Sequence, residues 1–164
     1  MNKSIKRILV PVDFSENSMR AKEYADTLAE KFGAEVELMH VVESSPYEVY
    51  VQKGFMVDVP LYVPMGETVP TSDPAVAFKD MLKEAEKQLI ELGNKGPGNY
   101  KTRVRSGHAV DQVLEEIKDY DADLLLMCTH GWTGLKHLML GSVTEKVVRL
   151  SPIPVLTTRG DANA

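Results

Sequence analysis

The alternation of short apolar segments with longer amphipathic segments constrains the fold of this chain more than any other feature. The apolar segments cover residues 5–12, 35–42, 100–105, 123–128 and 153–158, and four segments with helical periodicity separate them. Short apolar runs are typical of buried strands, whereas apolar residues at three- and four-residue spacing are typical of helices. Strands that alternate with helices build a parallel sheet that helices cover on both faces. We therefore expect a doubly wound α/β fold with five parallel strands.

Capping residues mark the ends of the predicted helices. Ser15 is placed to cap the first helix, and Gly33 is placed to end it. Asp73 and Pro74 form a cap followed by a first-turn proline, and Gly93 is expected to close this second helix. The residues expected to face the core from the first three helices are Ala21, Tyr24, Ala25, Leu28, Phe32, Phe78, Met81, Leu82, Ala85, Leu89, Leu92, Val110, Val113, Leu114 and Ile117.

Two prolines place the last predicted strand at an edge of the sheet. Pro152 and Pro154 lack the N–H group that a central strand needs for its hydrogen-bond ladder. In a doubly wound sheet the ligand crevice lies at the carboxyl ends of the strands, beside the point where the strand order reverses. The strand ends available to such a crevice are Val12-Asp13, Val41-Val42, Arg105-Ser106-Gly107 and Met127-Cys128.

Length, charge and cysteine content narrow the classes of function. A chain of 164 residues is expected to fold as a single domain, residues 1–164. The net charge of −5 argues against a nucleic-acid binder and against a protein that binds acidic membranes. The sequence shows no signal-peptide core and no apolar span long enough to cross a bilayer. One cysteine, Cys128, cannot form an internal disulfide, so we expect a cytoplasmic protein.

A long irregular loop is predicted at residues 43–73. The segment mixes prolines with aromatic residues and shows no clear periodicity. Connections of this length are uncommon inside a compact domain, and many of those known are functional or mobile. Three interpretations stay open for this loop: a variable surface insertion, a lid over a ligand, and an arm that contacts a partner.

The segment from Cys128 to Ser142 joins a predicted buried strand to a predicted helix. Glycines at positions 131, 134 and 141 let its backbone approach a ligand without a Cβ in the way. Backbone N–H groups and the helix dipole at such a position bind anions, most often phosphate. Ser142 and Glu145 also fit a capping box, in which their side chains satisfy free N–H groups at the helix start. A capping serine can still lie beside a phosphate, so the two roles of Ser142 are compatible.

The sequence contains no motif of a dedicated hydrolase or dehydrogenase. It has no Walker sequence, no Gly-x-Ser-x-Gly turn, and no Gly-x-Gly-x-x-Gly turn after the first strand. Its histidines, His40, His108, His130 and His137, lack the spacing of a metal site. We therefore expect no catalytic residues and no dedicated enzyme.

Motifs spread over nearly the whole chain point to one known family. They are Val10 to Ser15, His40-Val41, Gly107, Asp123 to Met127, Thr129 to Leu135, Leu140 to Glu145 and Ser151 to Val155. With these motifs the chain resembles the universal stress protein family. The resemblance implies a Rossmann-like sheet with strand order 3-2-1-4-5.

One glycine pattern links the chain to the nucleotide-binding branch of that family. The branch has the pattern Gly, two residues, Gly, nine residues, Gly, then Ser or Thr. Gly131, nine intervening residues, Gly141 and Ser142 fit this pattern, whereas Cys128 replaces its first glycine. The Cys128 side chain either crowds the ribose or a phosphate, or merely lines the cleft.

The resemblance implies an adenine-nucleotide site at the strand ends. Gly131 and Gly141 would lie against the phosphates, and Val41 would offer main-chain hydrogen bonds to the adenine edge. Asp13 would lie near the adenine and the ribose, where it would accept hydrogen bonds from the sugar or hold a metal ion through water. Its other role is to cap the first helix together with Ser15. The full set of expected ligand-binding residues is Pro11, Val12, Asp13, Val41, Met127, Cys128, His130, Gly131, Gly141, Ser142, Val143 and Thr144.

Three functions follow from the resemblance and stay open at this point. The first is a regulatory stress-response protein that binds ATP, with Mg²⁺ or Mn²⁺ as the accompanying ion. The second is a nucleotide-free dimeric adaptor of the same fold. The third is an ATPase that uses Asp13, for which no general base is evident, so hydrolysis would be slow at most. The resemblance also implies a homodimer that pairs the last strand, Ile153 to Thr158, across a two-fold axis.

Overall fold

The computed structural model describes residues 4–43, 74–98, 100–129 and 141–159. The strands are β1 (Arg7–Pro11), β2 (Glu35–Val42), β3 (Tyr100–Ser106), β4 (Leu124–Cys128) and β5 (Val155–Thr158). The helices are α1 (Glu16–Phe32), α3 (Pro74–Asn94), α4 (Ala109–Asp119) and α5 (Ser142–Leu150). Apart from Glu43, the loop predicted at 43–73 lies outside the described residues. Among the described helices, none combines the length and the apolar character needed to span a membrane.

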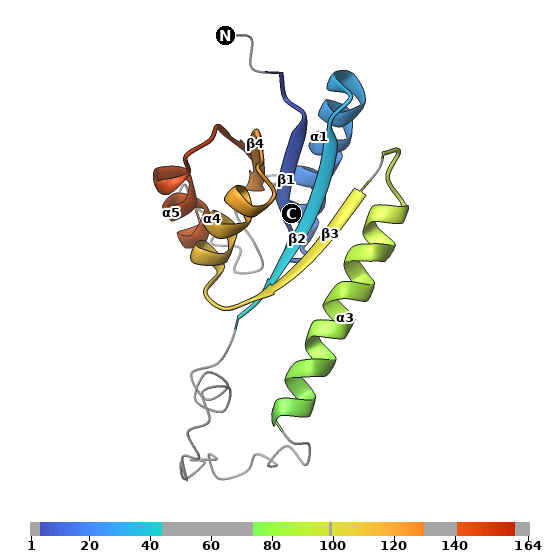
Figure 1. Ribbon diagram of the computed structural model, residues 1–164, viewed down its shortest axis with the longest axis vertical. Coiled ribbons are helices and arrows are strands. Elements are labelled where there is room, and N and C mark those ends of the chain that lie inside the picture. The colour runs from blue at the N-terminus through green and yellow to red at the C-terminus, as the bar shows by residue number, and fades with distance from the viewer. Residues whose placement is uncertain (1–3, 44–73, 99, 130–140, 160–164) are drawn as a thin grey trace.

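The five strands form one parallel sheet with the order β3-β2-β1-β4-β5 (Figure 1). This order confirms the expected fold class. From β1 the chain proceeds outward to β2 and β3, and it then crosses to β4 on the other side of β1. The strand order therefore reverses between β1 and β4. β5 follows Pro154 at the edge of the sheet, as the prolines predicted.

Helices cover both faces of the sheet, with α1 and α3 on one face and α4 and α5 on the other (Figure 1). Alternating residues of each strand point to opposite faces, so neighbouring positions of β1 belong to different layers. The buried residues of the first layer include Ile8, Val10, Leu38, Leu126, Ala21, Ala25 and Leu89. Those of the second layer include Leu9, Met39, Leu125, Met127, Val113, Ile117 and Val147.

Helix α1 has the predicted caps but a narrower buried face than the sequence predicted. Ser15 is the N-cap, its Oγ accepts a hydrogen bond from the Ser18 N–H at 3.2 Å, and Gly33 ends the helix at φ 64°. Tyr24 and Phe32 were expected in the core, but they are 57% and 49% exposed. The reason is that small alanines, at positions 21, 25 and 29, form the contact with the sheet, and the larger side chains flank that stripe.

Helix α3 differs from the prediction at two positions. Met81 was expected to be buried but is 55% exposed, because the contact with the sheet runs through Phe78, Ala85 and Leu89. The helix also continues through Gly93, which was expected to end it, and finishes at Asn94. A Cβ at Gly93 would lie 3.1 Å from the Cβ of Tyr100, so this glycine permits a close approach of β3.

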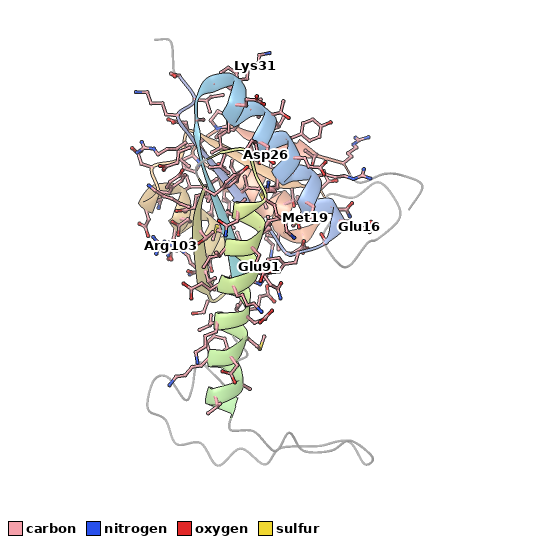
Figure 2. All side chains as sticks on the ribbon, turned by 90° about the vertical axis from the view of Figure 1, so that its right-hand side faces the viewer. Glu16, Met19, Asp26, Lys31, Glu91 and Arg103 are labelled. Atoms are coloured by element: carbon pink, nitrogen blue, oxygen red, sulfur yellow. The ribbon has the colours of Figure 1, made fainter. Side chains whose placement is uncertain are left out.

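A buried ion pair within α1 is joined by a hydrogen bond from the start of β3. The Lys22 ammonium, in a residue only 6% exposed, lies 2.7 Å from the Asp26 carboxylate, and the Tyr100 hydroxyl donates to the same carboxylate. Figure 2 shows Asp26 near the middle of α1 and Glu16 at its first turn. Because a buried charge is costly without its partner, this cluster holds α1 beside the start of β3.

Candidate functional site

A cavity of about 510 Å³ lies at the carboxyl ends of β1, β2 and β4. It is bordered by the first turns of α1, α4 and α5 and reaches both layers of the core, since Ser18 of α1 and Val113 of α4 both line it. Its position is the point where the strand order reverses, which is where a doubly wound sheet is expected to bind ligands.

The structure brings ten of the twelve residues expected in a ligand site together around this cavity. They are Pro11, Val12, Asp13, Val41, Met127, Cys128, Gly141, Ser142, Val143 and Thr144. The other two, His130 and Gly131, lie outside the described residues. The ten described positions come from β1, β2, β4, α5 and the residues next to them, so the sheet topology gathers residues that are far apart in the chain.

Asp13 lines the cavity at the turn between β1 and α1. Its carboxylate Oδ1 accepts hydrogen bonds from the Ser15 N–H at 3.1 Å and from the Ser15 hydroxyl at 2.5 Å. The same hydroxyl accepts from the Ser18 N–H, so Asp13 orients the cap of α1. The predicted capping role of Asp13 together with Ser15 is thus present, and the carboxylate also lies at the cavity wall.

The first turn of α5 forms the opposite wall of the cavity. The Gly141 N–H donates to the Thr129 carbonyl at 2.7 Å, and the Thr144 hydroxyl donates to the Cys128 carbonyl at 2.9 Å. These two bonds tie the helix start to the end of β4. The N–H groups of Ser142, Val143 and Thr144 have no acceptor within the helix, because an α-helix leaves the donors of its first turn unsatisfied. All three residues line the cavity, so the positive end of the helix dipole lies there.

The capping box predicted for Ser142 and Glu145 is wrong. Gly141 is the N-cap and Ser142 is the first helical residue, since the Glu145 N–H already donates to the Gly141 carbonyl at 2.8 Å. The Glu145 carboxylate instead pairs with Arg149 one turn later, at 3.0 Å. The chain enters the helix one residue earlier than the pattern predicted. Gly141 has φ −56° and ψ 146°, angles open to any residue, so its backbone conformation does not require glycine.

The end of β3 does not line the cavity, although Arg105-Ser106-Gly107 was among the strand ends expected to be available to the crevice. The Arg105 guanidinium turns toward α4, where it donates to the carboxylates of Glu116 and Asp119. Gly107 follows at φ 135°, which favours glycine, and its N–H donates to the Val42 carbonyl at 3.1 Å. Two strands, β2 and β1, separate β3 from β4, so only the ends of β1, β2 and β4 reach the crevice.

Six further lining residues were not predicted from the sequence, namely Ser18, Met39, His40, Glu43, Ala109 and Val113. Three of them, Met39, His40 and Glu43, belong to β2 or follow it directly. Their closeness in sequence to Val41 could have predicted that they line the cavity. Ala109 and Val113 lie one turn apart at the start of α4, and Ser18 lies in the first turn of α1. Helix starts face the carboxyl ends of the preceding strands, which is the signal that identifies these three.

Carboxylates are the charged groups of the described cavity wall. Asp13 and Glu43 line it, and the described lining residues include no Lys or Arg. Among the residues that the structure describes, no group of three His, Cys, Asp or Glu side chains is arranged to hold a metal ion. An anion here would be stabilised by the N–H groups of α5, and a metal ion would need ligand or water oxygens in addition to these carboxylates.

Comparison with known proteins identifies the family. Residues 4–62 and 56–159 match the sequence profile of the universal stress protein family. The chain belongs to that family. Among universal stress proteins of Methanocaldococcus jannaschii, MJ0531 is 30% identical over 154 residues, which cover 94% of this chain and 82% of MJ0531. MJ0577 is 29% identical over 163 residues, which cover 97% of this chain and 98% of MJ0577.

Solved structures of universal stress proteins share the fold. The structure of MJ0577 has a TM-score of 0.75 at 24% identity and covers 97% of this chain and 99% of its own. A universal stress protein in complex with cAMP has a TM-score of 0.58 at 21% identity, over 96% of this chain and 98% of its own. The universal stress protein from Archaeoglobus fulgidus in complex with dAMP has a TM-score of 0.59 at 15% identity, over 94% and 98%.

Proposed function

We propose that this universal stress protein is a regulatory protein that binds an adenine nucleotide, ATP in the first place, in the cavity at the ends of β1, β2 and β4. The observation that carries the proposal is the pairing of two walls across one cavity of about 510 Å³. One wall has the three first-turn N–H groups of α5 that have no acceptor within the helix, and the other has the Asp13 carboxylate. A cavity of this size is within the range of small-molecule sites.

The two walls suit the two ends of a nucleotide. The N–H groups of Ser142, Val143 and Thr144 would bind phosphate oxygens, with Gly141 leaving space for them. Asp13 would accept hydrogen bonds from the ribose hydroxyls. Pro11, Val12 and Met127 would contact the base, and Val41 would supply main-chain hydrogen bonds to its edge. His130 and Gly131 belong to the same proposed site through the glycine pattern.

The family relationship supports an adenine nucleotide in particular. Two proteins with the same fold have been solved with cAMP and with dAMP, and both ligands contain adenine and a phosphate. The departure from the glycine pattern at Cys128 does not close the cavity, because the half-buried Cys128 side chain is part of its wall.

A divalent ion, Mg²⁺ or Mn²⁺, fits this proposal as part of the ligand. Magnesium in nucleotide sites keeps several waters and is held by phosphate oxygens together with one or two carboxylates. Asp13, reached through water, supplies a carboxylate of that kind. Bound in this way, the ion would neutralise phosphate charge beside the acidic wall.

The test is isothermal titration of the protein with ATP and MgCl₂, with GTP as the control for base selectivity. Saturable binding of ATP at one site per chain is expected, with GTP weaker. A variant with Gly141→Val is expected to lose most of the affinity, and Gly141→Ala provides the smaller change for comparison. A well-folded protein that takes up no ATP would overturn the proposal.

A nucleotide-free dimeric adaptor is the second candidate, and Cys128 is the observation that favours it. Its side chain stands where the nucleotide-binding branch has glycine. In that case Gly141→Val leaves dimerisation and partner binding unchanged. Hydrolysis is a third possibility, which requires ATP turnover above the uncatalysed rate that is abolished in Asp13→Asn.

We further propose that the protein is a cytoplasmic homodimer in which β5 pairs with its copy. β5 is an edge strand with Leu156 40% exposed, and exposed strand edges need protection from uncontrolled pairing.

A further inference from the structure

His40 lies on β2 directly beside the turn that carries Asp13. Its Nδ1 is 2.7 Å from the Val12 carbonyl oxygen, and its ring lies 4.6 Å from the Phe14 ring, centroid to centroid, at an angle of 37°. His40 thus contacts the residue before Asp13 and the residue after it. A backbone carbonyl only accepts hydrogen bonds, so Nδ1 carries the proton in this contact.

This contact fixes the tautomer of the imidazole. A neutral imidazole has one N–H group, and here that group is Nδ1–H, which leaves Nε2 as an acceptor. Protonation of the ring adds a proton at Nε2 and keeps Nδ1–H. The bond to the Val12 carbonyl is therefore present in both protonation states of His40. Val12 itself is only 4% exposed, so its carbonyl depends on partners inside the protein.

The turn that His40 contacts has an unfavourable backbone conformation. Phe14 has φ 62°, in the left-handed region that residues with a Cβ avoid. Such a conformation persists only where the surroundings impose it. Here the Asp13 carboxylate accepts from Ser15 on one side, and the Phe14 ring packs on His40 on the other.

We propose that His40 is a positioning residue, which holds the Asp13 carboxylate at the cavity wall through its hydrogen bond to Val12 and its ring contact with Phe14. The role in ligand binding rests on the proposed nucleotide site. The positioning itself is a property of the ligand-free protein, so it is testable whether or not ATP binds.

Two substitutions separate the hydrogen bond from the ring. His40→Phe keeps an aromatic ring for Phe14 and removes the donor to Val12. His40→Asn removes the ring but places an amide N–H at the δ position, where Nδ1 lies in histidine. Thermal unfolding of both variants confirms that they are folded before any other comparison is made.

The ligand-free measurement is nuclear magnetic resonance of the imidazole nitrogens, the Asp13 carboxyl carbon and the Ser15 amide. The wild type is expected to show the Nδ1–H tautomer of neutral His40. His40→Phe is expected to shift the Asp13 and Ser15 signals, and His40→Asn is expected to restore them in large part. A neutral His40 in the Nε2–H tautomer, or Asp13 and Ser15 signals unchanged in His40→Phe, would overturn the proposal.

Titration with ATP and MgCl₂ supplies the functional measurement. Loss of one buried hydrogen bond predicts about tenfold weaker binding in His40→Phe, and His40→Asn is expected to stay near the wild type. Equal loss of affinity in both variants would mean that the ring acts only in packing and would contradict positioning by the hydrogen bond. A wild type that binds no ATP refutes the nucleotide site, and the resonance signals then decide the positioning role alone.

Discussion

At the scale of single residues, Glu37 is a carboxyl whose pKa the fold strongly raises. It lies in the middle of β2, is 3% exposed, and shares a hydrogen bond with the Glu116 carboxyl of α4, which is 1% exposed. Burial and the neighbouring Glu116 raise the pKa of Glu37 to about 8, and Arg103 and Lys101 offset this rise only in part. Glu37 therefore holds a proton at neutral pH. The two buried carboxyl groups together then carry one negative charge instead of two.

The raised pKa predicts that this site makes the protein less stable as the pH rises. The unfolded chain releases the Glu37 proton near pH 4.5, whereas the folded protein keeps it up to about pH 8. The stabilisation is therefore complete below pH 4.5 and is lost as the pH rises through 8, because the unfolded state binds fewer protons in between. Urea unfolding from pH 5 to 9 should show a decrease that Glu37→Gln removes. The exposed Glu91→Gln is the control, and an equal decrease in Glu37→Gln would contradict the assignment.

Asp13 provides a second prediction at the residue scale. Asp13→Asn keeps an Oδ1 acceptor for Ser15 but removes the charge, so the cap of α1 survives while the proposed bonds to the ribose weaken. We expect ATP affinity to fall about tenfold, the usual effect of losing a charge-assisted hydrogen bond. The melting temperature should change little. Unchanged affinity in calorimetry would place the nucleotide away from Asp13.

At the scale of elements, the start of α5 depends on its attachment to β4. The Thr144 hydroxyl donates to the Cys128 carbonyl at 2.9 Å, and Thr144 is 5% exposed. Thr144→Val removes the buried hydroxyl that donates to this carbonyl, so we expect a loss of about 1–3 kcal/mol in the free energy of unfolding. Thr144→Ser keeps the hydroxyl and is the matched control. Equal stability of the Val and Ser variants in chemical denaturation would show that the bond does not fix the helix.

The sequence predicted the elements well because local rules govern them. β2 has the predicted bounds, and Ser15 and Gly33 cap α1 as expected. The predictions failed where tertiary packing decides. Met81 matches the helical period but points away from the sheet, and Gly93 allows the approach of Tyr100 instead of ending the helix. No local pattern contains that information, because the partners belong to other elements.

The same distinction applies to the candidate site. Asp13 and Ser142 were predictable because they follow strands or begin helices, and the topology brings such positions together. The role of Ser142 was not predictable to one residue, since Gly141 is the N-cap. The sequence presented His40 only as part of a family motif and as a histidine without the spacing of a metal site. Its bond to the Val12 carbonyl depends on the register of β2 against β1, which the sequence alone does not fix.

At the scale of the whole molecule, β5 is the element that would connect two copies. Leu156 is 40% exposed on this edge strand, and Val148 and Leu150 of the neighbouring α5 are 42% and 59% exposed. We expect a dimer in sedimentation at micromolar concentration. Leu156→Lys should yield monomers, because a charge would be buried in the interface, whereas Met81→Lys on α3 should leave the dimer intact. A monomeric wild type would refute pairing through β5.

The proposed adenine-nucleotide site lies between Asp13 and the first turn of α5. Amide resonances of the isotope-labelled protein during titration with ATP and MgCl₂ test it most directly. Saturable shifts of Ser142, Val143 and Thr144 are expected, since their N–H groups would donate to phosphate. The amides of Glu35 and Asp121, outside the cavity wall, should stay in place. Unchanged α5 amides at saturating ATP, or shifts confined to Glu35 and Asp121, would contradict nucleotide binding at this site.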